Sequence, residues 1–114
     1  MSDCLFCKIA SGEIPSREVY ADGRFYAFED INPQAPVHFL VIPRRHIATL
    51  NDLAPDDGPM LGDLLLLTGK LAKDRGIAEE GWRLNFNCKE GAGQTVFHIH
   101  AHVLGGRVFT WPPG

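Results

Sequence analysis

Hydrophobic and polar residues alternate in several short segments of the chain, and this period of two is typical of half-buried β-strands. Residues 82–87 alternate most clearly, and residues 37–42 form a β-branched, hydrophobic segment that Pro43 ends. The dipeptide Asp22-Gly23 separates two further segments, and it tolerates the positive φ of a tight hairpin turn. The predicted strands therefore span residues 19–21, 24–28, 37–42, 82–87 and 96–104.

A period near 3.6 replaces this alternation in two segments, which we predict to be helical. The long helix runs from Pro59 to Arg75, with proline at its first position and Gly76 as its stop. Its hydrophobic face consists of Met60, Leu61, Leu64, Leu65 and Leu71. The short helix covers Cys4 to Ala10, with Asp3 as its cap and Gly12 as its stop. Its hydrophobic face consists of Leu5, Phe6 and Ile9.

The order of these elements predicts an α+β fold. Residues 32–36 and 91–94 are expected to be loops because they are rich in proline and glycine. Strands and helices do not alternate along the chain as a parallel sheet requires. We therefore expect a single domain over residues 1–114, with an antiparallel sheet of about five strands and one long and one short helix on one face.

Composition excludes several classes of function. The chain has 114 residues, of which 45% are hydrophobic and 22% charged, as in ordinary globular domains. Its net charge is −3 and its Lys and Arg residues are scattered, so we expect no binding to polymeric nucleic acid. The longest hydrophobic run, Leu64 to Leu67, is too short to span a membrane, and the N-terminus resembles no signal peptide. A cytoplasmic location is the expectation.

Three histidines alternate with hydrophobic residues near the C-terminus. If residues 96–104 form one strand, then His98, His100 and His102 share a face and lie roughly 6.5–7 Å apart. Such a row could be surface histidines, a catalytic metal site or a nucleophilic site, because neutral imidazole can attack phosphorus. The preceding loop favours a nucleophile, since Gly93 permits close backbone approach and Thr95 adds a hydroxyl to an anion cradle.

The histidine segment, His98-Ile99-His100-Ala101-His102-Val103-Leu104, resembles the signature of the histidine triad family. The block from Phe28 to Pro43 is similar to the family's other characteristic segment. Gly93 to Val96 and the ending from Leu104 to Gly114 resemble its purine nucleoside phosphoramidase branch in particular. The resemblance implies a homodimer whose two sheets join edge to edge, with each active site near the interface.

The resemblance also implies a role for individual residues. His100 matches the nucleophile that forms a covalent nucleotidyl intermediate, and His102 and His38 match the histidines around it. Asp30 matches the carboxylate that binds the ribose hydroxyls. The positions around the purine base are Phe6, Ile9, Phe28 and Ile31. The positions that hold the phosphate are Asn87, Gly93, Thr95 and Val96. Trp111 belongs to a C-terminal segment that reaches toward the partner's site.

Two of the three cysteines have the spacing Cys-x-x-Cys, at Cys4 and Cys7. They could be a redox pair, structurally idle thiols or half of a tetrahedral zinc site, and the absence of a βαβ context disfavours the redox pair. The related nucleotidyl transferases that act on sugar phosphates carry a structural zinc on such a pair, a distant histidine and the first triad histidine. That likeness implies Cys4, Cys7, His46 and His98 as ligands. Cys88 stands alone and is expected to be a small packed residue.

The expected activity is hydrolysis of a phosphorus–nitrogen bond in a purine nucleoside phosphoramidate, with release of AMP or GMP and no cofactor required for the chemistry. His102 matches hydrolases, because the sugar-phosphate transferases have glutamine at that position. A dinucleoside polyphosphate hydrolase and a non-catalytic nucleotide-binding module are the alternatives. A fourth possibility is a metal-dependent hydrolase whose zinc is bound by His100 and His102.

Overall fold

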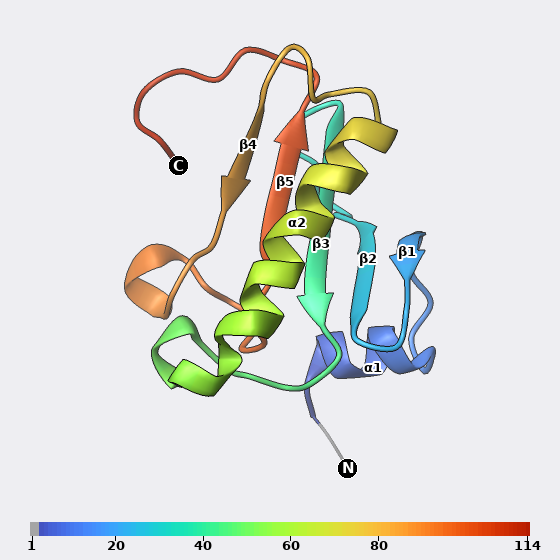
Figure 1. Ribbon diagram of the computed structural model, residues 1–114, viewed down its shortest axis with the longest axis vertical. Coiled ribbons are helices and arrows are strands. Elements are labelled where there is room, and N and C mark those ends of the chain that lie inside the picture. Colours follow the sequence, from blue (N-terminus) through green and yellow to red (C-terminus); the bar gives the residue numbers. More distant parts are fainter. Residues whose placement is uncertain (1–2) are drawn as a thin grey trace.

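The computed structural model describes residues 3–114, and these form an α+β domain around one five-stranded antiparallel sheet (Figure 1). The strands are β1 (Glu18–Ala21), β2 (Phe25–Glu29), β3 (Val37–Pro43), β4 (Trp82–Asn85) and β5 (Ala101–Gly105). Their order across the sheet is β1-β2-β3-β5-β4, so β1 and β4 are its edges. The helices are α1 (Leu5–Ser11) and α2 (Gly58–Asp74), with short 3₁₀ turns at Leu50–Asp52, Pro55–Asp57 and Glu90–Ala92. The predicted fold class is confirmed.

Helix α2 crosses one face of the sheet and covers the main hydrophobic core (Figure 1). Leu64 and Leu71 are buried as predicted, against Phe39, Val41 and Val103 of the central strands. Leu65 is 47% exposed, whereas Leu67 is buried, so the hydrophobic face lies slightly further round the helix than the sequence pattern predicted. Neither helix of the described chain is long and hydrophobic enough to span a bilayer.

Helix α1 packs on the opposite face of the sheet, so the expectation that both helices share one face was wrong. Phe6 and Ile9 of this helix form a second buried cluster with Phe28 and Leu40, whose neighbours along β2 and β3 point to the α2 side. The physical reason is that the two central strands are hydrophobic at successive positions, so both of their faces need cover.

The ends of α1 differ in part from prediction. Cys4, not Asp3, is the N-cap, because its Sγ accepts a hydrogen bond from the backbone N of Cys7 at 3.4 Å. Gly12 ends the helix as predicted, with a φ of +88° that glycine adopts readily. The β1–β2 hairpin is also confirmed, but Gly23 does not supply a positive φ. Instead, the Asp22 carboxylate accepts from the backbone N of Arg24 and of Phe25, both at 2.7 Å.

The last two strands are shorter than predicted: β4 ends at Asn85 and β5 begins only at Ala101. The chain bends over residues 96–98 and leaves the regular hydrogen-bonding pattern of the sheet. There the backbone N of Ile99 donates to Ile47 O at 2.8 Å, in the segment that follows β3. The three histidines therefore do not lie on one continuous pleated strand, and the expectation of a shared face was wrong for His98.

Candidate functional site

A cavity of about 880 Å³ lies between α1, the end of β2, the loop after β4 and the start of β5. Every residue predicted to contact the nucleotide lines this cavity, with the exception of Trp111. These residues are Phe6, Ile9, Phe28, Asp30, Ile31, Asn87, Gly93, Thr95 and Val96. Two of the predicted catalytic histidines, His100 and His102, also line it, and the third, His38, is buried behind them. Trp111 is 84% exposed and lies outside the cavity of its own chain.

One end of the cavity is aromatic and apolar. Phe6 meets Phe28 edge-on with ring centroids 5.3 Å apart, and it meets His100 edge-on at 4.9 Å. Ile31 stands fully exposed at the rim, where a bound ligand could cover it. Apolar and aromatic walls of this kind suit a flat heterocyclic ring.

The hydrogen bond of His100 defines which ring nitrogen is available for chemistry. Its Nδ1 lies 2.7 Å from the carbonyl oxygen of His98. A carbonyl can only accept, so Nδ1 carries the proton and Nε2 of the neutral ring carries the lone pair. This bond orients the His100 ring as a nucleophile requires. Burial lowers the pKa of His100, so the neutral form dominates at pH 7.

His102 and His38 form a second hydrogen-bonded pair, with His102 Nδ1 and His38 Nε2 3.0 Å apart. The backbone N of Gln34 donates to His38 Nδ1 at 3.0 Å, so the proton of neutral His38 is on Nε2. His38 therefore donates to His102 Nδ1, and the proton of neutral His102 lies on Nε2. His102 presents an N–H to the cavity where His100 presents a lone pair.

The Asp30 carboxylate lies beside this pair, with Oδ2 3.3 Å from His38 Nε2 and 3.8 Å from His102 Nδ1. Its Oδ1 accepts from the backbone N of Asn32 at 2.8 Å, which orients the side chain at the end of β2. Burial, followed by the neighbouring His100 and His38, lowers the pKa of His102 to about 4. Burial likewise lowers the pKa of His38 although Asp30 opposes the shift. All three rings are thus neutral at pH 7.

The loop after β4 supplies backbone donors to the same cavity. Neither the N–H of Thr95 nor that of Val96 donates to another residue of the described chain, and both residues line the cavity. Gly93 adopts a φ of +91°, which reverses the chain immediately before them. The backbone N–H groups of Thr95 and Val96 and the Thr95 hydroxyl belong to residues that line the same cavity as the neutral histidines. Together these donors suit the oxygens of an anionic phosphate.

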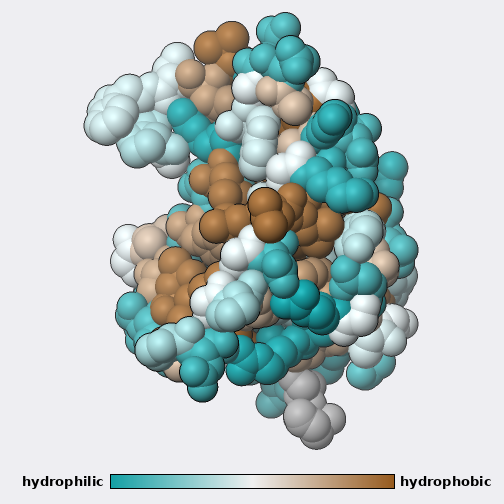
Figure 2. Space-filling model, viewed as in Figure 1, coloured by the Kyte–Doolittle hydropathy of each residue, from teal (hydrophilic) through white to brown (hydrophobic). Residues whose placement is uncertain are grey.

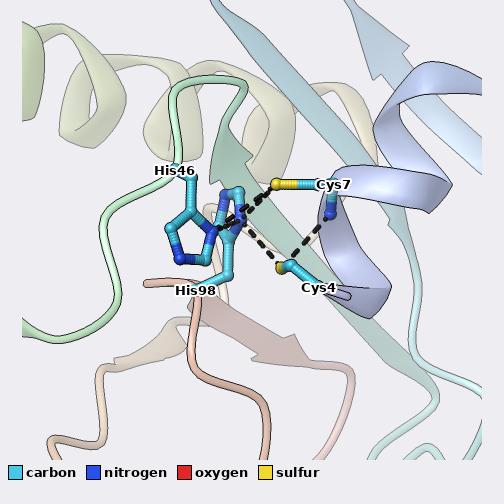
Figure 3. Close-up of side chains that lie close together, drawn as sticks. All are labelled: Cys4, Cys7, His46 and His98. Carbon is cyan, nitrogen blue, oxygen red and sulfur yellow. Dashed lines mark hydrogen bonds between the residues drawn. The ribbon is translucent and has the colours of Figure 1, made fainter. Parts of the chain in front are cut away.

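A separate cluster joins α1 to the segment before β5, and it contains the four predicted metal ligands Cys4, Cys7, His46 and His98 (Figure 3). His98 Nδ1 lies 3.4 Å from Cys4 Sγ, 3.5 Å from Cys7 Sγ and 3.3 Å from His46 Nδ1. In a tetrahedral zinc site with Zn–N of about 2.0–2.1 Å and Zn–S of about 2.3 Å, two nitrogen ligands, or a nitrogen and a sulfur ligand, are separated by roughly 3.3–3.6 Å. The observed separations have this size.

The tautomer of His98 also suits a metal. Its Nε2 lies 2.7 Å from the carbonyl oxygen of Pro43, so Nε2 carries the proton and Nδ1 directs its lone pair into the cluster. A carbonyl behind the distal nitrogen is the usual support of a ligating histidine. Asp30, His38 and His102 form another group of suitable ligand atoms. His100 belongs to neither group of the described residues, so this geometry offers no support for a catalytic zinc on His100 and His102.

Part of the cavity wall consists of residues that were not predicted as site residues: Leu5, Pro15, Ser16, Arg17, Pro33 and Leu40. Pro33 and Leu40 lie in the block from Phe28 to Pro43, but the resemblance implied no role for them. The other four lie in α1 or between α1 and β1, carry no motif, and reach the site because α1 packs on the second face of the sheet.

Comparison with known proteins agrees with the sequence resemblance. Residues 3–108 match the family model described as scavenger mRNA decapping enzyme C-term binding. A HIT-like protein of Synechocystis is 49% identical over 112 residues, which is 98% of this chain and 97% of that protein. Protein HitA of Neisseria gonorrhoeae is 45% identical over 105 residues, which is 92% of this chain and 97% of that protein.

Solved structures give the same result. A HIT family hydrolase from Legionella pneumophila superposes with a TM-score of 0.96 at 55% identity, over 98% of this chain and 100% of that one. A histidine triad protein from Clostridium difficile gives a TM-score of 0.93 at 42% identity, over 96% of each chain. The fold and the site thus define a hydrolase-like α+β domain with a histidine-lined cavity. The chain belongs to the histidine triad (HIT) family.

Proposed function

We propose that this protein hydrolyses the phosphorus–nitrogen bond of purine nucleoside phosphoramidates through a covalent nucleotidyl intermediate on His100. One observation carries the proposal: the His100 Nδ1–H bonds to the carbonyl of His98, so its Nε2 lone pair is available at the cavity wall. The same cavity presents the His102 N–H and the unused N–H groups of Thr95 and Val96, which suit a phosphate oxyanion.

In this proposal the nucleotide binds along the cavity. The purine base packs between Phe6, Ile9 and Phe28 at the aromatic end, and Ile31 folds over it at the rim. Asp30 accepts hydrogen bonds from the ribose hydroxyls through the carboxylate lone pairs that Asn32 leaves unused. The α-phosphate rests beside Asn87, Gly93, Thr95 and Val96. Because burial keeps His100 and His102 neutral, His100 retains its lone pair for attack and His102 retains one N–H to donate.

The reaction proceeds in two displacements. His100 Nε2 bonds to the α-phosphorus as the bond from phosphorus to the leaving nitrogen breaks, and the leaving nitrogen takes one proton from solvent and departs as the amine. Neutral His102 donates a hydrogen bond from Nε2 to a phosphate oxygen and keeps its proton, with His38 fixing its tautomer. Water then attacks phosphorus, the bond to His100 breaks, and the proton of the water returns to solvent. AMP or GMP is released and the neutral imidazole of His100 is regenerated.

Zinc, in this proposal, has a structural role. Cys4, Cys7, His46 and His98 would hold it, and it would tie α1 to the backbone that carries the carbonyl partner of His100. It supplies a fixed geometry and takes no part in the bond-forming steps.

The proposal includes assembly of the protein as a homodimer. Figure 2 shows hydrophobic side chains gathered over α2, where Leu66 is 76% exposed, and β4 is an open edge beside them. Dinucleoside polyphosphate hydrolysis is the second candidate, since the same His100 geometry would serve any substrate with a good leaving group at the α-phosphate.

The decisive experiment is to mix the protein with adenosine 5′-phosphoramidate, quench in alkali and search for adenylylated His100 by mass spectrometry. His100→Ala should lose turnover by at least roughly a thousandfold while it still binds AMP. Free imidazole added to His100→Gly should restore adenylyl transfer to the imidazole itself. Hydrolysis at the parent rate in His100→Ala would contradict the proposal, and loss of AMP binding alone would indicate a disrupted cavity.

A further inference from the structure

We propose that Gln94 is a positioning residue that holds the phosphate-binding segment, Thr95 and Val96, in register with His100. This inference rests on the proposed function. Gln94 is 3% exposed and does not line the cavity, although the residues on both sides of it do. A buried polar side chain needs hydrogen-bond partners, and the Gln94 amide has one for its oxygen and two for its nitrogen.

The amide of Gln94 connects three segments. Its Oε1 accepts from the backbone N of Lys89 at 2.7 Å. Its Nε2 donates to the carbonyl oxygens of Ala48 at 2.8 Å and Val96 at 3.1 Å. One acceptor and two donors on one short side chain are needed here, and a primary amide provides them.

Each of these bonds bears on the site. Lys89 has a φ of +69°, a conformation that residues other than glycine rarely adopt. The side-chain bond and the bond from Gln94 N to Lys89 O together close the loop around it. The bond to Val96 O holds the carbonyl end of the segment formed by Thr95 and Val96. The backbone N–H groups of these two residues donate to no other residue of the described chain.

The bond to Ala48 sets the distance to the nucleophile. The residue before Ala48 is Ile47, whose carbonyl accepts from the backbone N of Ile99 between His98 and His100. Gln94 therefore connects the phosphate-binding segment to residues 47–48. The same two residues include the partner of the Ile99 backbone, next to His100. Without this link, the cradle and the nucleophile could move independently, and alignment for attack on phosphorus would be lost.

The test compares a ligand that has the phosphate with one that lacks it. Calorimetry should show that Gln94→Ala weakens AMP binding about tenfold to a hundredfold, the range expected when a hydrogen bond to a charged group is lost, and leaves adenosine binding within about twofold. With adenosine 5′-phosphoramidate, kcat/KM should fall at least as far as AMP affinity. Gln94→Glu keeps the size and the acceptor for Lys89 but loses both N–H donors, so it should show the same selective loss.

Leu67→Ala is the control, because Leu67 is a buried core residue of α2 that does not line the cavity, so its truncation lowers stability without removing a contact of the loop. Its ratio of AMP to adenosine affinity should equal that of the parent. An unchanged ratio in folded Gln94→Ala and Gln94→Glu would overturn the positioning role. Adenylylation of His100 in the parent protein would stand in that case, so the two proposals fail separately.

Discussion

His98 and His100 are two residues apart, yet their rings serve different sites and are linked through the backbone. The His100 ring donates from Nδ1 to the carbonyl of His98, while the His98 ring turns into the cysteine cluster and donates from Nε2 to Pro43. The same residue thus orients the candidate nucleophile through its main chain and belongs to the candidate metal-binding cluster through its side chain.

Metal removal is expected to lower stability. The purified protein should carry one zinc ion, and Cys7→Ser should lose it because a hydroxyl replaces a thiolate ligand. The melting temperature should fall by more than roughly 5 °C, which corresponds to about 1 kcal/mol in a domain of this size. Metal analysis and thermal unfolding measure both effects. Cys88→Ser is the matched control, since Cys88 lies outside the cluster and should retain both the metal and the melting temperature. A metal-free parent protein that chelator does not affect would contradict the assignment.

Protonation of His102 is expected to destabilise the fold in mild acid. Its pKa is about 4 in the folded chain and about 6.5 in the unfolded chain, so between these values the unfolded state binds more protons. The free energy of unfolding should therefore fall as the pH drops from about 6.5 to 4, by at most roughly 3 kcal/mol from this group. His102→Gln cannot titrate and should flatten the denaturation profile over this window. Parallel profiles for parent and variant would contradict the shift.

The sequence predicted most of the fold because its local signals are strong. The β1–β2 hairpin, β3, α2 and the Gly12 stop of α1 are confirmed, since alternation, proline and glycine act over a few residues. The face covered by α1 was predicted wrongly. Its hydrophobic stripe shows that it packs, but successive hydrophobic positions in β2 and β3 leave either face available, and the choice depends on tertiary contacts.

Only the site residues that belong to sequence motifs could be predicted. The cavity brings together His100, His102, Asp30 and Thr95 from separate blocks, as the resemblance implied. The bend at residues 96–98 was not predictable, because alternation over residues 96–104 resembles an unbroken strand. The bond from Ile99 to Ile47 and the burial of His98 against Pro43 outweigh that local preference. The role of Gln94 likewise depends on a contact with Ala48, which is distant in sequence.

Dimerisation is expected to depend on the exposed leucines of α2. Leu66→Asp places a charge among the exposed leucines of α2 and should convert the dimer to a monomer in sedimentation experiments. Ile31→Asp is the control, because Ile31 is also an exposed hydrophobic residue but stands at the rim of the cavity rather than on α2. A parent protein that sediments as a monomer at all concentrations would contradict the expectation.

Trp111 provides a test of whether one chain completes the site of the other. The ring is 84% exposed and lies outside the cavity of its own chain, so a role in catalysis requires that it act on the partner's site. Trp111→Ala should then raise KM roughly tenfold, equivalent to about 1.4 kcal/mol of lost contact. Mixing Trp111→Ala with His100→Ala should restore activity, because one site of each mixed dimer then combines an intact His100 with an intact Trp111 from the other chain. The control mixture pairs Trp111→Ala with a chain carrying both substitutions, and it should regain nothing. If the first mixture also stays at the level of its components, Trp111 acts within its own chain or not at all.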